Sequence, residues 1–109
     1  MDKKTSICKY LHQNHKGRKN AIHSRQLEQI FSIDGRNLRR KICSLRKDGY
    51  PICSDDNGYD YAEKQEEIND TIQRLNSLAR RITITRNGML FSTASISLEP
   101  SATLFSKEE

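Results

Sequence analysis

The 109-residue sequence has no long hydrophobic run, and hydrophobic residues make up only 34% of it. No stretch approaches the ~20 consecutive apolar residues that a membrane-spanning helix needs. No continuous apolar run follows the charged start Asp2-Lys3-Lys4, so we expect no secretory leader. The low apolar content also predicts one small domain that carries the core, with part of the chain peripheral to it.

Cysteine is scarce, and Cys8, Cys43 and Cys53 form no C-x-x-C pair. An odd number of cysteines without a leader predicts reduced thiols and a cytoplasmic protein. The spacing of Cys8, His12 and His15 matches no standard zinc pattern, so we expect no metal site.

The signatures of common enzymes are also missing. The chain has no glycine-rich phosphate loop, no Ser/His/Asp arrangement of recognisable spacing and no paired carboxylates in a pocket-forming context. We therefore predict a protein that is not an enzyme and that needs no cofactor.

Acidic residues are absent from residues 36–47, which hold six basic residues. The net charge is +5, and it is unevenly distributed. Residues 1–62 hold 13 Lys and Arg against 7 Asp and Glu, whereas residues 63–109 hold 6 against 7. The positive charge therefore belongs to the N-terminal part, which favours a polyanionic partner.

The same basic stretch carries Leu38, Ile42 and Leu45 at spacings of four and three. This spacing predicts a helix with one buried face and basic residues on the others. Asp34 is placed to cap its start, and Gly49 to end it. A helix of this kind is suited to entering a nucleic-acid groove, and we expect it to be a recognition helix.

The flanking segments predict further elements. A first helix is expected at Thr5 to Gln13, and Ser24 is expected to be the N-cap of a second helix. Two strand-like pieces flank Asn57-Gly58, a strong hairpin signal. The second helix is predicted to end near Phe31 and to bury Leu27, Ile30 and Phe31.

The run from Ala21 to Ala62 carries a characteristic set of residues, namely Ile22, His23, Ser24, Leu27, Ile33, Arg39, Ile42, Leu45, Arg46, Gly49, Pro51, Ile52, Gly58 and Tyr59. With these residues it resembles the winged-helix domains of DeoR-type repressors and the N-terminal domain of biotin-ligase repressors. It is most similar to small winged-helix proteins of phages and mobile elements of Gram-positive bacteria. The resemblance implies a winged helix-turn-helix, of α+β class and mainly α, that binds double-stranded DNA as a transcriptional regulator.

In a major groove, Arg36 and Arg40 are predicted to contact guanine edges, and Asn37 an adenine. Other polar residues are predicted to contact phosphates, which position a protein without reading sequence. On the same helix these are Arg39, Lys41, Ser44 and Lys47, and beyond it Lys16, Arg18, Lys19 and Arg25.

The predicted wing is acidic, with Asp55, Asp56, Asn57 and Gly58 at its tip and Asp60 after it. A wing that contacts DNA normally offers Arg or Lys. The alternative is a phage protein-interaction or inhibitor module, for example one of anti-CRISPR type, that uses the acidic wing against a host nucleoprotein.

Residues 63–82 predict an amphipathic helix, because apolar residues recur at spacings of four and three. This helix either packs on the domain of residues 1–62 or pairs with a second copy as a homodimer. The apolar residues are Ile68, Ile72, Leu75, Ala79 and Ile82.

The C-terminal part allows two interpretations. Residues 83–98 are predicted to extend the chain beyond this helix. Their β-branched content and turn chemistry favour a second β-hairpin that turns at Asn87-Gly88. Alternatively, the preceding helix continues to about Asn87. Residues 99–109 predict a flexible tail. Within the tail, the segment 102–105 vaguely resembles peptides that bind sliding clamps, so a replication accessory factor is a further alternative.

Overall fold

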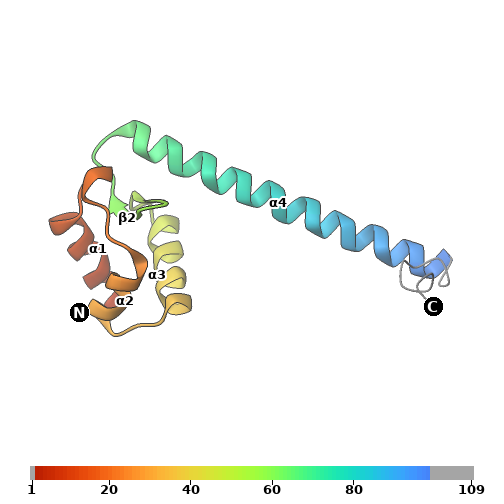
Figure 1. The fold of residues 1–109 in the computed structure, drawn as a ribbon, viewed down its shortest axis with the longest axis horizontal. Helices are drawn as coiled ribbons and strands as arrows, with labels where there is room; N and C mark the ends of the chain where they lie inside the picture. The colour runs from red at the N-terminus through yellow and green to blue at the C-terminus, as the bar shows by residue number, and fades with distance from the viewer. Residues whose placement is uncertain (1, 99–109) are drawn as a thin grey trace. The chain divides into compact units, whose positions relative to one another are not determined.

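The computed structural model describes the backbone of residues 2–98 and the side chains of residues 2–93. These residues form a mainly helical structure with one two-stranded antiparallel sheet, which confirms the α+β class (Figure 1). In chain order the elements are α1 (Lys3–Asn14), η1 (Arg18–Asn20), α2 (Ser24–Phe31), α3 (Gly35–Lys47), β1 (Ile52–Asp55), β2 (Gly58–Tyr61) and α4 (Gln65–Leu98).

The chain divides into two compact units, and the boundary lies between Gln73 and Arg74. The sequence placed this boundary near residue 62, at the end of the hairpin. The first unit extends further because the start of α4 is bonded to β1: the Cys53 thiol donates to the Glu67 carbonyl at 3.5 Å, and the Ser54 N–H donates to the Thr71 hydroxyl at 3.3 Å.

The core of the first unit is built from one face of each of its first three helices. Leu11 of α1, Leu27 of α2 and Leu38 of α3 are fully buried, and Ile42 is almost so. The prediction that Ile30 is buried is wrong, since its side chain is 49% exposed. At ~100° per residue, Ile30 points about 80° away from the direction between Leu27 and Phe31 that faces the core.

The predicted limits of α3 are confirmed. The Asp34 carboxylate accepts a hydrogen bond from the Asn37 backbone N–H at 2.8 Å, and its charge suits the positive end of the helix dipole. Gly49 follows the last turn with a φ of 97°, a conformation that glycine adopts most readily.

The start of α2 differs from the prediction. Ser24 is the first helical residue, and His23 takes the extended cap conformation without a side-chain cap bond. The backbone of Ile22 pairs with Tyr59 in an antiparallel bridge, which holds the chain extended up to His23. The helix therefore begins one residue earlier than a Ser24 cap would require.

The hairpin is confirmed, but its turn lies one residue before the predicted position. Asp55 pairs with Gly58, so the two turn residues are Asp56 and Asn57. Gly58 has a φ of 121°, and a Cβ built on it would lie 2.0 Å from the Ile22 carbonyl oxygen. Only glycine fits there, because Ile22 runs alongside β2 at hydrogen-bonding distance.

The second hairpin predicted for residues 82–98 is wrong, and so is the alternative of a helix that stops near Asn87. One helix, α4, continues to Leu98. Thr85 and Thr93 are accommodated because their hydroxyls donate to the carbonyls four residues earlier, at 2.9 and 3.2 Å. A two-stranded hairpin with nothing packed on it is marginally stable, so continuing the helix satisfies the backbone better. None of the helices in residues 2–98 is both long and apolar enough to cross a membrane.

Most of the stripe on residues 63–82 is exposed beyond the first turn of α4. Ile68 is half-buried, whereas Ile72 is 48% exposed, Leu75 41% and Ile82 60%. Ala79 is also exposed. The tail at 99–109, including the segment 102–105, lies outside the described residues.

Candidate nucleic-acid interface

The surface of α3 combines a completely buried apolar face with a uniformly basic one. Leu38, Ile42 and Leu45 are at most 2% exposed. The helix has no acidic residue, so every charge that it presents to solvent is positive. Of the residues predicted to contact DNA, Arg36, Asn37, Arg39, Arg40 and Lys47 are exposed, and Lys41 and Ser44 are half-buried.

Arg46, the one basic residue of the stretch that was not predicted to contact DNA, is turned inward. Its Nε donates to the Ile52 carbonyl at 2.8 Å, and its terminal nitrogen donates to the Ser54 hydroxyl at 3.0 Å. Burial lowers the pKa of Arg46. Arg46 therefore fixes the end of α3 to β1.

Asn37 lies in the first turn of α3, where its side chain takes part in the cap. Its amide nitrogen donates to the second oxygen of the Asp34 carboxylate at 3.3 Å. This bond is longer than an ordinary side-chain hydrogen bond. Asn37 can therefore exchange it for a base edge while its backbone N–H keeps the cap.

The structure pairs Arg18, one of the predicted phosphate contacts, with acidic side chains of the first unit. The Arg18 guanidinium lies 2.5 Å from the Asp70 carboxylate and 3.9 Å from that of Asp55, and the bond to Asp70 raises the pKa of Arg18. The positive charge of Arg18 is therefore paired within the first unit, with Asp55 of the hairpin and Asp70 of α4. The other basic residues predicted outside α3, namely Lys16, Lys19 and Arg25, are exposed.

Glu67, which the sequence did not single out, organises the start of α4. Its carboxylate accepts hydrogen bonds from the backbone N–H groups of Glu63 at 2.9 Å, Lys64 at 3.4 Å and Arg18 at 3.1 Å. These bonds, with that from Glu63 strongest, lower the pKa of Glu67. A sequence signal exists, because a glutamate at the third helical position often caps the helix start.

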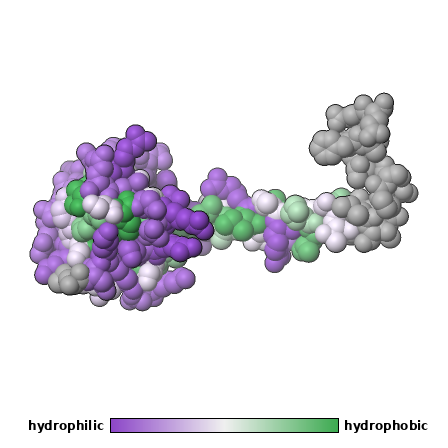
Figure 2. All heavy atoms as spheres, turned by 90° about the horizontal axis from the view of Figure 1, so that it is seen from below, coloured by the Kyte–Doolittle hydropathy of each residue, from purple (hydrophilic) through white to green (hydrophobic). Residues whose placement is uncertain are grey.

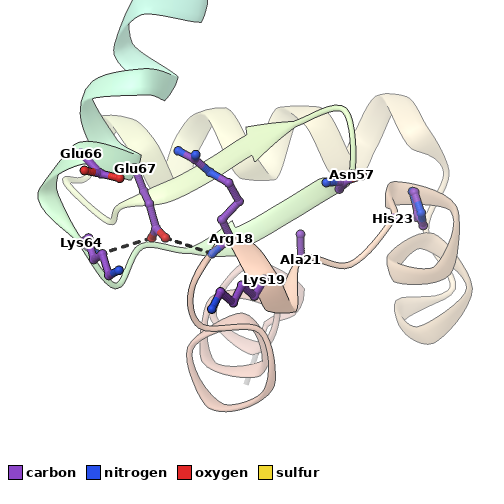
Figure 3. A pocket seen from close by; sticks show the side chains of 8 residues that line it. All are labelled: Arg18, Lys19, Ala21, His23, Asn57, Lys64, Glu66 and Glu67. Carbon is purple, nitrogen blue, oxygen red and sulfur yellow. Dashed lines mark hydrogen bonds between the residues drawn. The ribbon is translucent and has the colours of Figure 1, made fainter.

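An open pocket of about 580 Å³ lies beside this carboxylate. Figure 3 shows the Glu67 side chain reaching down from α4, with its dashed bonds to the loop that carries Arg18 and to Lys64. The two carboxylates of the pocket offset part of its positive charge, so it is a poorer anion site than α3. Its lining residues are Arg18, Lys19, Ala21, His23, Asn57, Lys64, Glu66 and Glu67.

The hairpin of β1 and β2, the predicted wing, is less acidic at its surface than its sequence predicts. Asp55 accepts from the Asn57 backbone N–H at 2.8 Å and faces Arg18. Asp60 is 2% exposed, because it pairs with Cys53 on the inner side of the hairpin. Burial, followed by the nearby Glu67, raises the pKa of Asp60 to about 6. Of these three aspartates, only Asp56 is exposed.

Within residues 2–98, no three or more His, Cys, Asp or Glu side chains gather where they could hold a metal ion. Cys8 and Cys53 are buried, and Cys43 is exposed on α3. Comparison with protein-family models, with curated proteins and with solved structures finds no match to this chain.

Proposed function

We propose that the chain is a sequence-specific double-stranded DNA-binding protein of the winged helix-turn-helix type, acting as a transcriptional regulator with α3 in the major groove. The observation that carries this proposal is the surface of α3. Its apolar face is buried, and its exposed charges at Arg36, Arg39, Arg40 and Lys47 are all positive. A major groove admits one helix and offers acceptors that arginine contacts with two hydrogen bonds.

The position of each side chain along α3 suggests its role. Arg36 and Arg40 lie in the N-terminal half, which reaches base edges first in helix-turn-helix proteins. Arg39 and Lys47 supply phosphate contacts from the flanks. Outside the helix, Lys16, Lys19 and Arg25 supply the remaining phosphate contacts, whereas Arg18 is engaged by Asp70.

The salt dependence of binding tests the proposal without knowledge of the operator. Selection from random duplexes supplies a ligand, and fluorescence anisotropy then measures its affinity at several salt concentrations. About six phosphate contacts predict a slope of log K against log salt of about −5. Absence of binding to every selected duplex at ~50 mM salt would overturn the proposal.

A matched pair of arginine substitutions separates base reading from general charge. Arg40→Ala removes an exposed arginine of α3, and Arg80→Ala removes an exposed arginine of α4. We expect Arg40→Ala to weaken binding by roughly 5- to 150-fold and to relax the preference at one base pair, since a bidentate contact contributes ~1–3 kcal/mol. Arg80→Ala should leave the base preference unchanged. Equal effects of the two substitutions would argue against reading by α3.

The inhibitor alternative draws less support from the structure than from the sequence. It relies on an acidic wing, but Asp60 is buried and Asp55 faces Arg18. The inhibitor alternative therefore has less acidic surface on the hairpin than the sequence suggests.

A further inference from the structure

Helix α4 exposes an apolar stripe that begins at Ile72, near the end of the first unit, and continues along the second unit. Every side chain from Arg74 to Thr93 is exposed. Figure 2 shows hydrophobic side chains in several places along this part of the helix. The stripe consists of Ile72, Leu75, Ala79 and Ile82, which fall within about 80° of one another at ~100° per residue. A stripe of this kind needs a partner surface.

The charges of this segment restrict what the partner can be. Between Thr71 and Leu98 the helix has four arginines and no acidic residue. Three of them point away from the stripe, but Arg86 continues it one turn beyond Ile82. The positions that border the stripe are uncharged, and they are Asn76, Leu78, Thr83 and Thr85. A partner therefore meets an apolar seam with neutral edges and one cation at its end.

A parallel pair of these helices, aligned residue to residue, is poorly self-complementary. It places Arg86 against Arg86 of the second copy inside the seam, where like charges destabilise the contact. It also places Ala79 against Ala79, which leaves a gap between two well-filled layers. Both faults occur in the same half of the seam.

An antiparallel pair removes both faults. With a two-fold axis at the level of Ser77, Ile72 lies opposite Ile82 of the second copy, and Leu75 lies opposite Ala79. A large side chain then faces a small one in each central layer, as a well-packed interface requires. Leu78 of each copy borders the axis, where the two leucines meet. The two Arg86 side chains are about 27 Å apart along the axis, at 1.5 Å per residue.

We propose that α4 forms an antiparallel homodimer through Ile72, Leu75, Leu78, Ala79 and Ile82, with its two-fold axis near Ser77. The match of large to small side chains across this face, with the two Arg86 side chains far apart, favours a second copy of the chain as the partner. The dimer does not depend on DNA binding, and it can be tested on the full chain without DNA.

The first experiment measures the oligomeric state of the full chain by analytical ultracentrifugation over a wide concentration range. Ile82 and Ile84 form a matched pair, because they are 60% and 61% exposed but lie on opposite sides of the helix. We expect Ile82→Lys to weaken the dimer about a hundredfold and Ile84→Lys to leave it nearly unchanged. A monomer at all concentrations, or equal effects of both variants, overturns the proposal. Circular dichroism confirms that both variants keep the helix.

The second experiment tests the orientation by disulfide trapping in a Cys43→Ser background, which removes the exposed thiol. Ile72→Cys and Ile82→Cys are prepared separately, mixed and oxidised. We expect a crosslink only in the mixture, because a disulfide needs Cα atoms within about 7 Å and each residue lies about 15 Å from its own copy. Crosslinking of either variant alone indicates a parallel pair. Crosslinking in neither case places the interface elsewhere, and both outcomes overturn the proposed arrangement.

Discussion

Two helices of this molecule carry similar apolar stripes, and only one stripe is buried. In α3, Ile42 is 1% exposed, whereas in α4 Ile82 is 60% exposed. Spacings of four and three make both helices amphipathic, so the pattern itself does not decide burial. The stripe of α3 is buried because α1, α2 and the hairpin surround it. The stripe of α4 beyond Gln73 remains available for a partner.

Replacing glycine by alanine is expected to have opposite effects in the two units, a loss of stability at Gly58 in the first and a gain at Gly88 in the second. Gly58→Ala should destabilise the first unit by roughly 4 kcal/mol or more, because a Cβ there collides with the Ile22 carbonyl and the φ is strained. Urea denaturation followed by tyrosine fluorescence measures this loss, since Tyr10 and the other three tyrosines lie in the first unit. A change of less than 1 kcal/mol would be inconsistent with the close approach of Ile22 to β2.

A pair of isoleucine truncations compares the two stripes directly. Ile42→Ala should lower the free energy of unfolding of the first unit by ~2–5 kcal/mol, the usual cost of a core cavity. Ile82→Ala in dilute protein should change it by less than about 0.5 kcal/mol, as exposed positions do. Urea denaturation of both variants at one low protein concentration checks the difference. A large effect of Ile82→Ala under these conditions would show that its stripe is buried within one chain.

The buried Asp60 makes the stability of the first unit depend on pH. Its pKa is raised from 3.8 to about 6, because burial disfavours the charged form. The folded state therefore binds this proton more tightly, and stability is lost as the pH rises through about 6. The loss approaches about 3 kcal/mol near neutral pH, at about 1.4 kcal/mol per pKa unit.

Asp60→Asn removes this titration. We expect the variant to be more stable than the wild type near neutral pH and to match it near about pH 4, where Asp60 is protonated in the folded state. Urea midpoints measured across this range test the expectation. A difference between the two proteins that does not change with pH would rule out the titration of Asp60 as its cause.

The smallest effect concerns Gly88, which lies inside α4. A Cβ added to Gly88 meets no atom within 4 Å, so Gly88→Ala should stabilise the helix by about 1 kcal/mol. Far-UV circular dichroism during heating should show a higher helical content for the variant. A loss of structure would instead favour a hairpin that turns at Asn87-Gly88, where glycine is preferred.

Much of the first unit could be predicted from its sequence. Asp34, the Leu38-Ile42-Leu45 stripe and Gly49 define α3 through local capping and periodicity, and the structure confirms all three. The cap at Ser24 was predicted wrongly, because the pairing of Ile22 with the distant Tyr59 decided where α2 begins. The burial of Ile30 was also predicted wrongly, because the direction that faces the core lies between Leu27 and Phe31. The pairing of Arg18 with Asp70 could not be predicted either, because the two residues are 52 positions apart in the sequence.

In residues 82–98 of α4, local signals predicted the wrong element. Residues 82–98 contain β-branched residues and an Asn-Gly pair, which are local signals of a hairpin. The helix continues because its own backbone bonds are satisfied at every step, whereas a hairpin needs another surface to pack on. Local propensity misled here because it takes no account of what a strand must pack against.

The basic, acid-free composition of α3, its capped start and the amphipathic period of α4 can be read from the chain alone, because they depend on neighbours within about four residues. Long-range contacts in the folded chain determine which charges remain at the surface. Arg46 is hydrogen-bonded to β1, Arg18 is ion-paired with Asp70, and Asp60 is buried on the inner side of the hairpin. The physical reason is that a long-range contact depends on the whole fold, whereas helix periodicity and capping are local.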